Sequence, residues 1–237
     1  MGKNLIQQAR GKGSHTYRAP SFNYKGKAKL SRITNNLEKG QIIDLVKCPG
    51  HDAPLAQIKY NNGETILVSA PENIKVGEYV TAGPGSEIKP GNVLTLREIP
   101  DGTNIYNIES QPGDGGKYCR SSGTSARLIS KTETTAVLKL PSKKEKEINL
   151  DCRAVIGIIC ASGRKEKPYL KAGIKMHAMR AKNKLYPRSK ACAMNAVDHP
   201  YGNKRSARKA KQKATSRHAP PGRKVGKLAP RRTGRKK

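Results

Sequence analysis

The chain has 237 residues, enough for one medium domain or two small ones. Its 48 Lys and Arg against 17 Asp and Glu give a formal net charge of +31. Solubility alone does not explain such a charge, because a few net charges suffice for solubility and further ones repel one another. We therefore expect a polyanionic partner, most commonly nucleic acid.

Residue usage excludes several other classes of protein. The five cysteines form no C-x-x-C pair and no set with zinc-site spacing, so we expect reduced thiols and no metal. No apolar run approaches the roughly 20 residues of a membrane span, and we expect no secretory signal. Nine Tyr, one Phe and no Trp favour two small aliphatic cores over one large core.

The first segment, residues 1–35, is a basic arm. It holds eight Lys and Arg and no acid, a formal charge of +8. Without a sustained apolar period it cannot bury enough surface to offset the entropy of ordering. We expect it to be disordered alone and to fold against RNA phosphates; a solvated tail is the alternative. Its candidate RNA contacts are Tyr17, Arg18 and Lys25.

Short strands follow in a middle region, residues 36–162, that carries 15 charges of each sign. Within residues 36–84, apolar runs at 42–46, 56–60, 65–68 and 78–80 have the length and alternation of strands. Asn62-Gly63 separates two of these runs and predicts a hairpin. Strands this short and evenly spaced predict a small barrel.

Residues 85–162 repeat the pattern. Their candidate strands lie at 93–96, 127–130, 135–140, 147–150 and 154–159, parted by polar turns. The fold predicted from these runs is all-β, with two small barrels in tandem. We place the domain boundary between Gly83 and Gly91 and draw it after residue 84.

A glycine-rich turn, residues 112–117, lies within the second barrel. It lacks the spacing of a nucleotide-binding phosphate loop, because Gln111 stands where a Gly is required and Tyr118 where Ser or Thr is required. We therefore expect no cofactor and no small-molecule substrate. Two interpretations stay open: a tight interdomain turn with positive φ, or a turn that also approaches RNA, with Lys117 and Arg120 on phosphate.

The last segment, residues 163–237, holds 25 Lys and Arg against Glu166 and Asp198, a formal charge of +23. Lys and Arg neutralise phosphates, and Arg adds bidentate contacts. We predict that these residues bind RNA: Arg164, Lys165, Lys167, Lys171, His177, Arg180, His199, Arg217, Arg223, Lys224, Arg231 and Arg232. Four tyrosines among basic residues can stack on bases or pack in the protein: Tyr17, Tyr24, Tyr186 and Tyr201.

His199 has an acid beside it, Asp198. A general base needs an orienting partner and a substrate pocket, and adjacent residues rarely orient each other's side chains. No nucleophile motif lies nearby. We therefore interpret His199 as an RNA-binding or packing residue and expect that the chain is not an enzyme.

Several motifs, taken in order, match one family. They are Tyr17-Arg18-Ala19-Pro20, Asp52-Ala53-Pro54-Leu55-Ala56, Ile99-Pro100-Asp101-Gly102-Thr103, the turn at 112–117, Met194 to Pro200, and Ala219-Pro220-Pro221-Gly222-Arg223-Lys224-Val225-Gly226. This order resembles the universal large-subunit ribosomal protein L-two family. The arm and the tail resemble its archaeal form.

The resemblance implies an OB-like barrel followed by an SH3-like barrel, with both extensions in large-subunit rRNA. It implies a cytoplasmic, structural protein of the large ribosomal subunit near the peptidyl transferase centre, supporting subunit assembly and association. Neighbouring ribosomal proteins and the small subunit at the interface are the further partners. Met194 to Pro200 would lie closest to that centre. The chain departs from the family after Gly202, where Asn203-Lys204-Arg205 interrupts a usual glycine run.

Two other classes of function stay open. One is an enzyme in which His199 takes part in peptide-bond chemistry. The other is a free translation factor or chromatin-like protein that binds nucleic acid loosely. The neutral, strand-rich middle argues against the second, because a nonspecific binder needs no shaped core.

Overall fold

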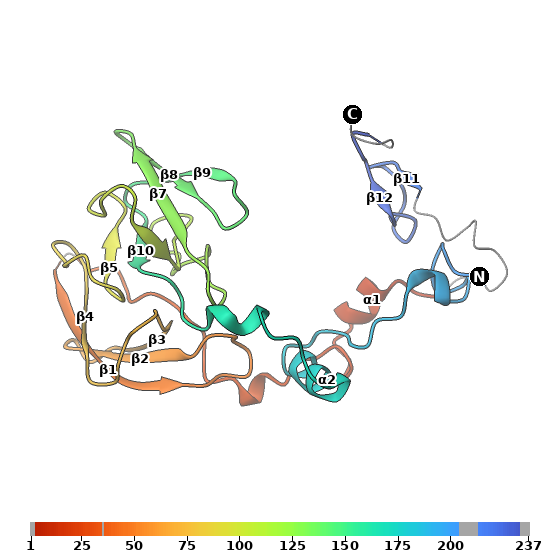
Figure 1. Ribbon diagram of the computed structural model, residues 1–237, viewed down its shortest axis with the longest axis horizontal. Coiled ribbons are helices and arrows are strands. Elements are labelled where there is room, and N and C mark those ends of the chain that lie inside the picture. Colours follow the sequence, from red (N-terminus) through yellow and green to blue (C-terminus); the bar gives the residue numbers. More distant parts are fainter. Residues whose placement is uncertain (1–2, 35, 204–212, 233–237) are drawn as a thin grey trace. The chain divides into compact units, whose positions relative to one another are not determined.

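The computed structural model describes residues 3–34, 36–203 and 213–232. They belong to two compact units (Figure 1). The first, Ser21–Leu170, is called the β unit below. The second combines Met1–Pro20 with Lys171–Lys237 and is called the extension unit.

The β unit is built on one long sheet. Its strands are β1 (Glu38–Val46), β2 (Leu55–Tyr60), β3 (Thr65–Ser69), β4 (Tyr79–Ala82), β5 (Val93–Thr95), β6 (Asn104–Tyr106), β7 (Ala126–Lys131), β8 (Thr135–Lys139), β9 (Glu145–Asn149) and β10 (Arg153–Ile156). They pair in the order β3-β2-β1-β4-β5-β10-β6-β7-β8-β9. Among the described residues of this unit, the remaining elements are the short 3-10 turns η1 (Ser21–Asn23) and η2 (Ser162–Lys165). The prediction of an all-β fold is confirmed.

Two hydrophobic cores pack on this sheet. The first includes Ile42 and Ile58, and the second includes Leu94 and Leu128. Strand β10 contributes to both: Val155 belongs to the first core, while its neighbours on either side belong to the second. Successive side chains of a strand point to opposite faces, so one strand can join two cores. The boundary after residue 84 and the order of the two barrel types stay predictions.

The predicted hairpin at Asn62-Gly63 is confirmed. β2 and β3 pair antiparallel, and Gly63 has a φ of +84°. The Asn62 side-chain oxygen accepts a hydrogen bond from the Glu64 N–H at 2.8 Å. This bond satisfies a turn N–H and holds the left-handed Gly in place.

Part of the predicted basic arm is built into the β unit. Ala28, Leu30 and Ser31 are only 1, 6 and 3 % exposed. Arg153 on β10 forms an ion pair with Glu109 at 2.8 Å and donates a further hydrogen bond to the Ser31 carbonyl at 2.9 Å. The expectation of a disordered arm is therefore wrong for residues 28–31, because Ala28 and Leu30 pack into apolar clusters of the β unit and Arg153 binds the Ser31 carbonyl.

The glycine-rich turn at residues 112–117 also receives the arm. Gly115 and Gly116 have φ values of +78° and +94°, which confirms the predicted positive φ. A Cβ at position 116 would overlap the Asn107 side chain. The Gly115 carbonyl accepts a hydrogen bond from the Leu30 N–H at 3.2 Å. Gly116 therefore permits a close approach of the turn to Asn107, while the backbone of Gly115 binds the arm.

Asp114 holds this turn together. Its carboxylate accepts hydrogen bonds from the Ser110 hydroxyl at 2.5 Å and from the N–H groups of Ser110, Gly116 and Gln111 at 2.9, 2.9 and 3.2 Å. Partial burial opposes ionisation, but these hydrogen bonds outweigh it and hold the pKa of Asp114 well below its usual range.

We expect acid to weaken the fold through Asp114. A depressed folded-state pKa contributes stability that is present above the unfolded value of about 3.9 and lost as pH falls through the folded value. Urea unfolding at about pH 7 and about pH 3 measures the loss, which should be smaller in Asp114→Asn than in the wild type. Asp101→Asn, at an exposed turn position, is the control. An equal pH dependence in all three proteins would contradict this role of Asp114.

The extension unit contains α1 (Ile6–Gly11), α2 (Ala172–Ala181), η3 (Ala191–Ala193) and a parallel pair of short strands, β11 (Ala214–Thr215) and β12 (Lys227–Leu228). Of its described residues only Gly202 is buried. Throughout the described ranges, no helix has the length and apolar character of a membrane span. The unit therefore has little apolar core to stabilise it.

Residues near the start of the chain contact residues of the C-terminal extension in this unit. Lys3 Nζ lies 2.8 Å from Asp198 Oδ1. The Asn183 side-chain amide donates a hydrogen bond to the Tyr17 carbonyl. The charge pattern of the sequence predicts two separate basic arms. In the structure, residues 1–20 and residues 171–237 belong to one unit.

Candidate nucleic-acid interface

The positive charge is concentrated in the extension unit. Its residues include 26 Lys and Arg against one acid, Asp198, a formal charge of +25. The β unit has 22 Lys and Arg against 16 Asp and Glu, a formal charge of +6. Asp198 is itself paired with Lys3. A cationic unit with almost no buried side chain is one that a bound polyanion would stabilise.

The residues predicted to bind RNA are divided between the two units. The extension unit contains Tyr17, Arg18, Lys171, His177, Arg180, His199, Arg217, Arg223, Lys224, Arg231 and Arg232. The β unit contains Lys25, Lys117, Arg120, Arg164, Lys165 and Lys167. All are exposed except Tyr17 and His199, which are half-buried. Their role in RNA binding stays a prediction.

Three of the β-unit residues predicted to bind RNA have partners within the protein. Arg120 Nη2 donates to the Ala28 carbonyl at 2.6 Å. Lys117 Nζ lies 3.4 Å from an Asp114 carboxylate oxygen. Arg164 donates from Nε to the Ser122 hydroxyl at 2.9 Å. A guanidinium has five N–H donors, so these contacts orient both arginines and leave donors for a phosphate.

Helix α2 places basic side chains on the surface. It has no buried residue, no acidic residue in its first turn and no side-chain cap. His177 and Arg180 are exposed on it, and Lys175 Nζ lies 5.2 Å from the centre of the Tyr186 ring. That distance is within the range of a cation–π contact, so the Tyr186 ring is packed against a cation.

His199 lies in a tight turn. The Gly202 N–H donates to the His199 carbonyl at 2.8 Å, and a Cβ at position 202 would overlap the Asn195 carbonyl. The Tyr201 N–H donates to His199 Nδ1 at 3.0 Å. A neutral ring with Nδ1 as acceptor carries its proton on Nε2. It therefore offers a donor at Nε2 rather than the free lone pair that a general base needs.

Tyr201 fastens this turn to the C-terminal strands. Its hydroxyl accepts a hydrogen bond from the Lys213 N–H at 3.3 Å and donates to the Val225 carbonyl at 3.4 Å. A Cβ at Gly226 would overlap the hydroxyl. Of the two interpretations for Tyr201, this geometry favours packing. The departure from the family after Gly202 falls mostly on residues 204–212, outside the described residues.

Lys3 and Lys213 position the extension unit in ways that were not predicted from the sequence. One signal was present for Lys3: Asp198 is the single acid of residues 1–20 and 171–237. A carboxylate among so many cations is expected to pair with one of them. Nothing in the sequence indicates which one, because the partners lie 195 positions apart.

No group of three or more His, Cys, Asp and Glu side chains in the described ranges could hold a metal ion.

Residues 89–221 match the family model described as "Ribosomal Proteins L2, C-terminal domain". This segment begins before β5 and extends into the C-terminal extension, so it spans both kinds of structure. The chain belongs to the ribosomal protein L2 family.

Relatives in the L2 family match along the whole chain. The "Large ribosomal subunit protein uL2" of Methanothermobacter thermautotrophicus is 50% identical over 242 residues, covering 100% of both chains. The proteins of the same name from Methanococcus maripaludis and Methanococcus aeolicus are 48% and 47% identical, again covering 100% of both chains. The predicted L2 resemblance, in its archaeal form, is confirmed.

Membership of the L2 family answers the broad question of function. The chain is a structural constituent of the large ribosomal subunit, located with the ribosome in the cytoplasm, and not an enzyme. As such it associates with rRNA and with other ribosomal proteins. The alternative of a free factor is thereby overturned.

Proposed function

We propose that this L2 protein binds large-subunit rRNA near the peptidyl transferase centre and supports subunit assembly and association with the small subunit. The observation that carries the proposal is the charge of the extension unit, 26 Lys and Arg against one ion-paired acid. The predicted RNA-binding residues supply the contacts. The half-buried turn around His199 belongs to the segment expected closest to that centre.

The mechanism is electrostatic. Lys and Arg replace the condensed counterions of the RNA, and the released ions drive binding. The β unit has two apolar cores of its own, which stabilise it independently of this contribution. The extension unit gains stability from the RNA by mass action, because RNA binds its folded form.

Co-sedimentation of a tagged chain with ribosomal particles at low and high salt tests this function. Stoichiometric presence in the large subunit that survives high salt, followed by cross-linking to rRNA near the peptidyl transferase centre, is the expected result. Release at moderate salt, or cross-links confined to rRNA remote from that centre, would contradict the proposed location.

The His199→Ala variant is expected to leave the peptidyl transfer rate of assembled large subunits within about threefold of wild type. Loss of an essential general base usually costs roughly 10²–10⁴-fold, and the Nδ1 hydrogen bond makes His199 a donor. Single-turnover peptidyl transfer on purified particles measures the rate, with His177→Ala as a matched control. A loss of more than about 100-fold in particles that assemble normally would restore the enzymatic alternative.

A further inference from the structure

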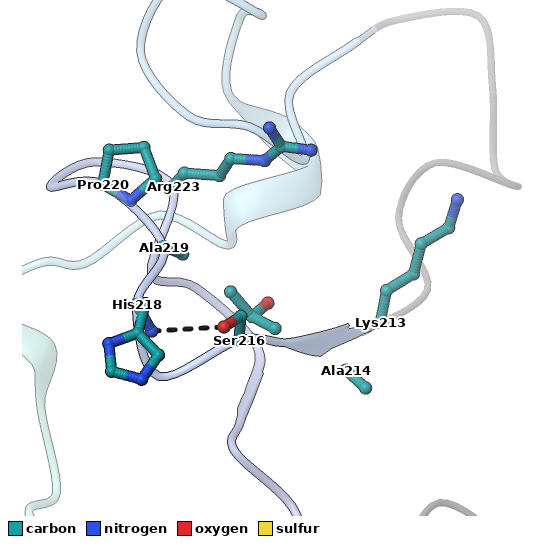
Figure 2. A pocket seen from close by; sticks show the side chains of 8 residues that line it. Lys213, Ala214, Ser216, His218, Ala219, Pro220 and Arg223 are labelled. Atoms are coloured by element: carbon teal, nitrogen blue, oxygen red, sulfur yellow. Dashed lines mark hydrogen bonds between the residues drawn. The ribbon is translucent and has the colours of Figure 1, made fainter.

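The C-terminal extension forms a half-open cavity of about 380 Å³ (Figure 2). Its wall is formed by the chain from β11 to the turn that follows, and includes Lys213, Ser216, His218, Pro220 and Arg223. Pockets for small ligands span roughly 300–1,000 Å³. The cavity is therefore of a size for one small group and not for a helical segment of RNA.

The cavity is chemically suited to an anion that carries a flat ring. Lys213 and Arg223 provide two cations, Ser216 a hydroxyl, and His218 an imidazole ring. Residues 199–237 contain no Asp or Glu, so no carboxylate of this segment competes for these cations. In Figure 2 the Lys213 side chain extends upward and the Arg223 side chain runs to the right, while the His218 ring lies below them.

Hydrogen bonds within the extension hold the wall in place. The His218 N–H donates to the Ser216 hydroxyl at 3.2 Å (Figure 2). The Thr215 hydroxyl donates to the Val225 carbonyl at 2.8 Å, and the Ala229 N–H donates to the Thr215 carbonyl at 2.8 Å. The loop is thus tied to β12 before a ligand enters, which lowers the entropy cost of binding.

We propose that this cavity binds a single rRNA nucleotide turned out of its stack. Lys213 and Arg223 bind its phosphate, and the base stacks on the His218 ring and against Pro220. Proteins recognise single-stranded RNA by this combination of a stacking ring and cations on the backbone. This inference rests on the proposed rRNA binding and specifies one of its contacts.

The first test is the affinity of the full-length chain for transcribed large-subunit rRNA, measured across a range of salt. At about pH 8, above the range in which histidine side chains usually carry charge, His218→Ala should weaken binding about 5- to 150-fold without changing the salt slope. That range corresponds to the loss of one base–aromatic stack. The control Arg231→Ala, an exposed cation outside the cavity, should instead lower the slope by about 0.7–0.9.

The outcomes separate the two proposals. If the wild-type chain binds the rRNA and the His218→Ala variant binds it with the same affinity, the nucleotide site alone is overturned. A wild-type chain that does not bind the rRNA overturns both the site and the proposed function.

A photoreactive residue at position 218 provides a second readout. The variant with p-benzoylphenylalanine in place of His218 should cross-link, in purified large subunits, to one rRNA nucleotide. The same group in place of Arg188, an exposed residue outside the cavity wall, should not reach that nucleotide. A cross-link from position 218 to a neighbouring protein would assign the cavity to a protein side chain and overturn the inference.

Discussion

The Arg153→Met variant is expected to lose about 3–5 kcal/mol of unfolding free energy, the usual cost of leaving one member of a buried ion pair without its partner. The Glu109 side chain is 0 % exposed and that of Arg153 10 %. Both Glu109 oxygens accept hydrogen bonds from Arg153, at 2.8 Å and 3.3 Å. Replacement of the guanidinium strands a buried carboxylate and also releases the Ser31 carbonyl of the arm.

Urea unfolding measures the loss, with Arg97→Met as the matched control. Arg97 lies 3.0 Å from Asp151, and both side chains are 60 % exposed. An exposed pair of this kind contributes about 0–1 kcal/mol. Equal losses in the two variants would contradict the role assigned to burial.

A double variant separates the ion pair from the packing around it. Glu109→Leu combined with Arg153→Met should recover part of the stability lost in Arg153→Met, because it no longer buries an unpaired charge. Limited trypsin digestion reports the arm: cleavage after Lys29, which lies beside the buried Ala28, should be faster in Arg153→Met than in wild type.

The strands could be predicted from the sequence because their signals are local. Alternation in β2 and the Asn62-Gly63 turn both act over a few residues. β6, Asn104–Tyr106, was not predicted, since three residues are too few to show a period. The run predicted to continue to residue 159 ends as a strand at Ile156, before Gly157 with a φ of +113°.

The Glu109–Arg153 pair could not be predicted, because its partners are 44 positions apart. In the sequence both residues are charges within an electrically neutral segment, and most such charges are exposed. Nothing local distinguishes a charge that will be buried. The same limit applies to Ala28 and Leu30, whose burial depends on apolar partners that lie far away in the sequence, such as Leu55 for Ala28.

Charge predicted the chemistry of the interface but not its organisation. The basic composition of residues 1–35 and 163–237 indicated nucleic acid without any knowledge of the fold. Composition could not show that residues 21–34 belong with the sheet while residues 1–20 belong with the C-terminal extension. That division depends on backbone contacts, such as the Leu30 N–H to the Gly115 carbonyl.

The affinity of the chain for large-subunit rRNA is expected to fall steeply with salt. If about ten cations reach phosphates, log K should decrease with log[salt] at a slope of roughly −7 to −9. A fourfold rise in salt would then weaken binding by about 10⁴–10⁵-fold. Filter binding across a salt series measures this slope.

Where the charge lies decides how variants change that slope. Replacement by Gln of five exposed cations of the extension unit should reduce its magnitude by about 3.5–4.5, at about 0.7–0.9 per phosphate contact; these are Arg217, Arg223, Lys224, Arg231 and Arg232. The charge-matched control replaces five exposed lysines of the β unit: Lys39, Lys59, Lys139, Lys143 and Lys144. It should change the slope by less than about 1, because acidic residues balance most of that unit's charge.

If both sets reduce the slope equally, RNA contacts are spread over the whole surface and the extension unit is not the principal interface. If only the replacement of the five extension-unit cations reduces the slope, the extension unit, with its formal charge of +25, accounts for most of the counterion release.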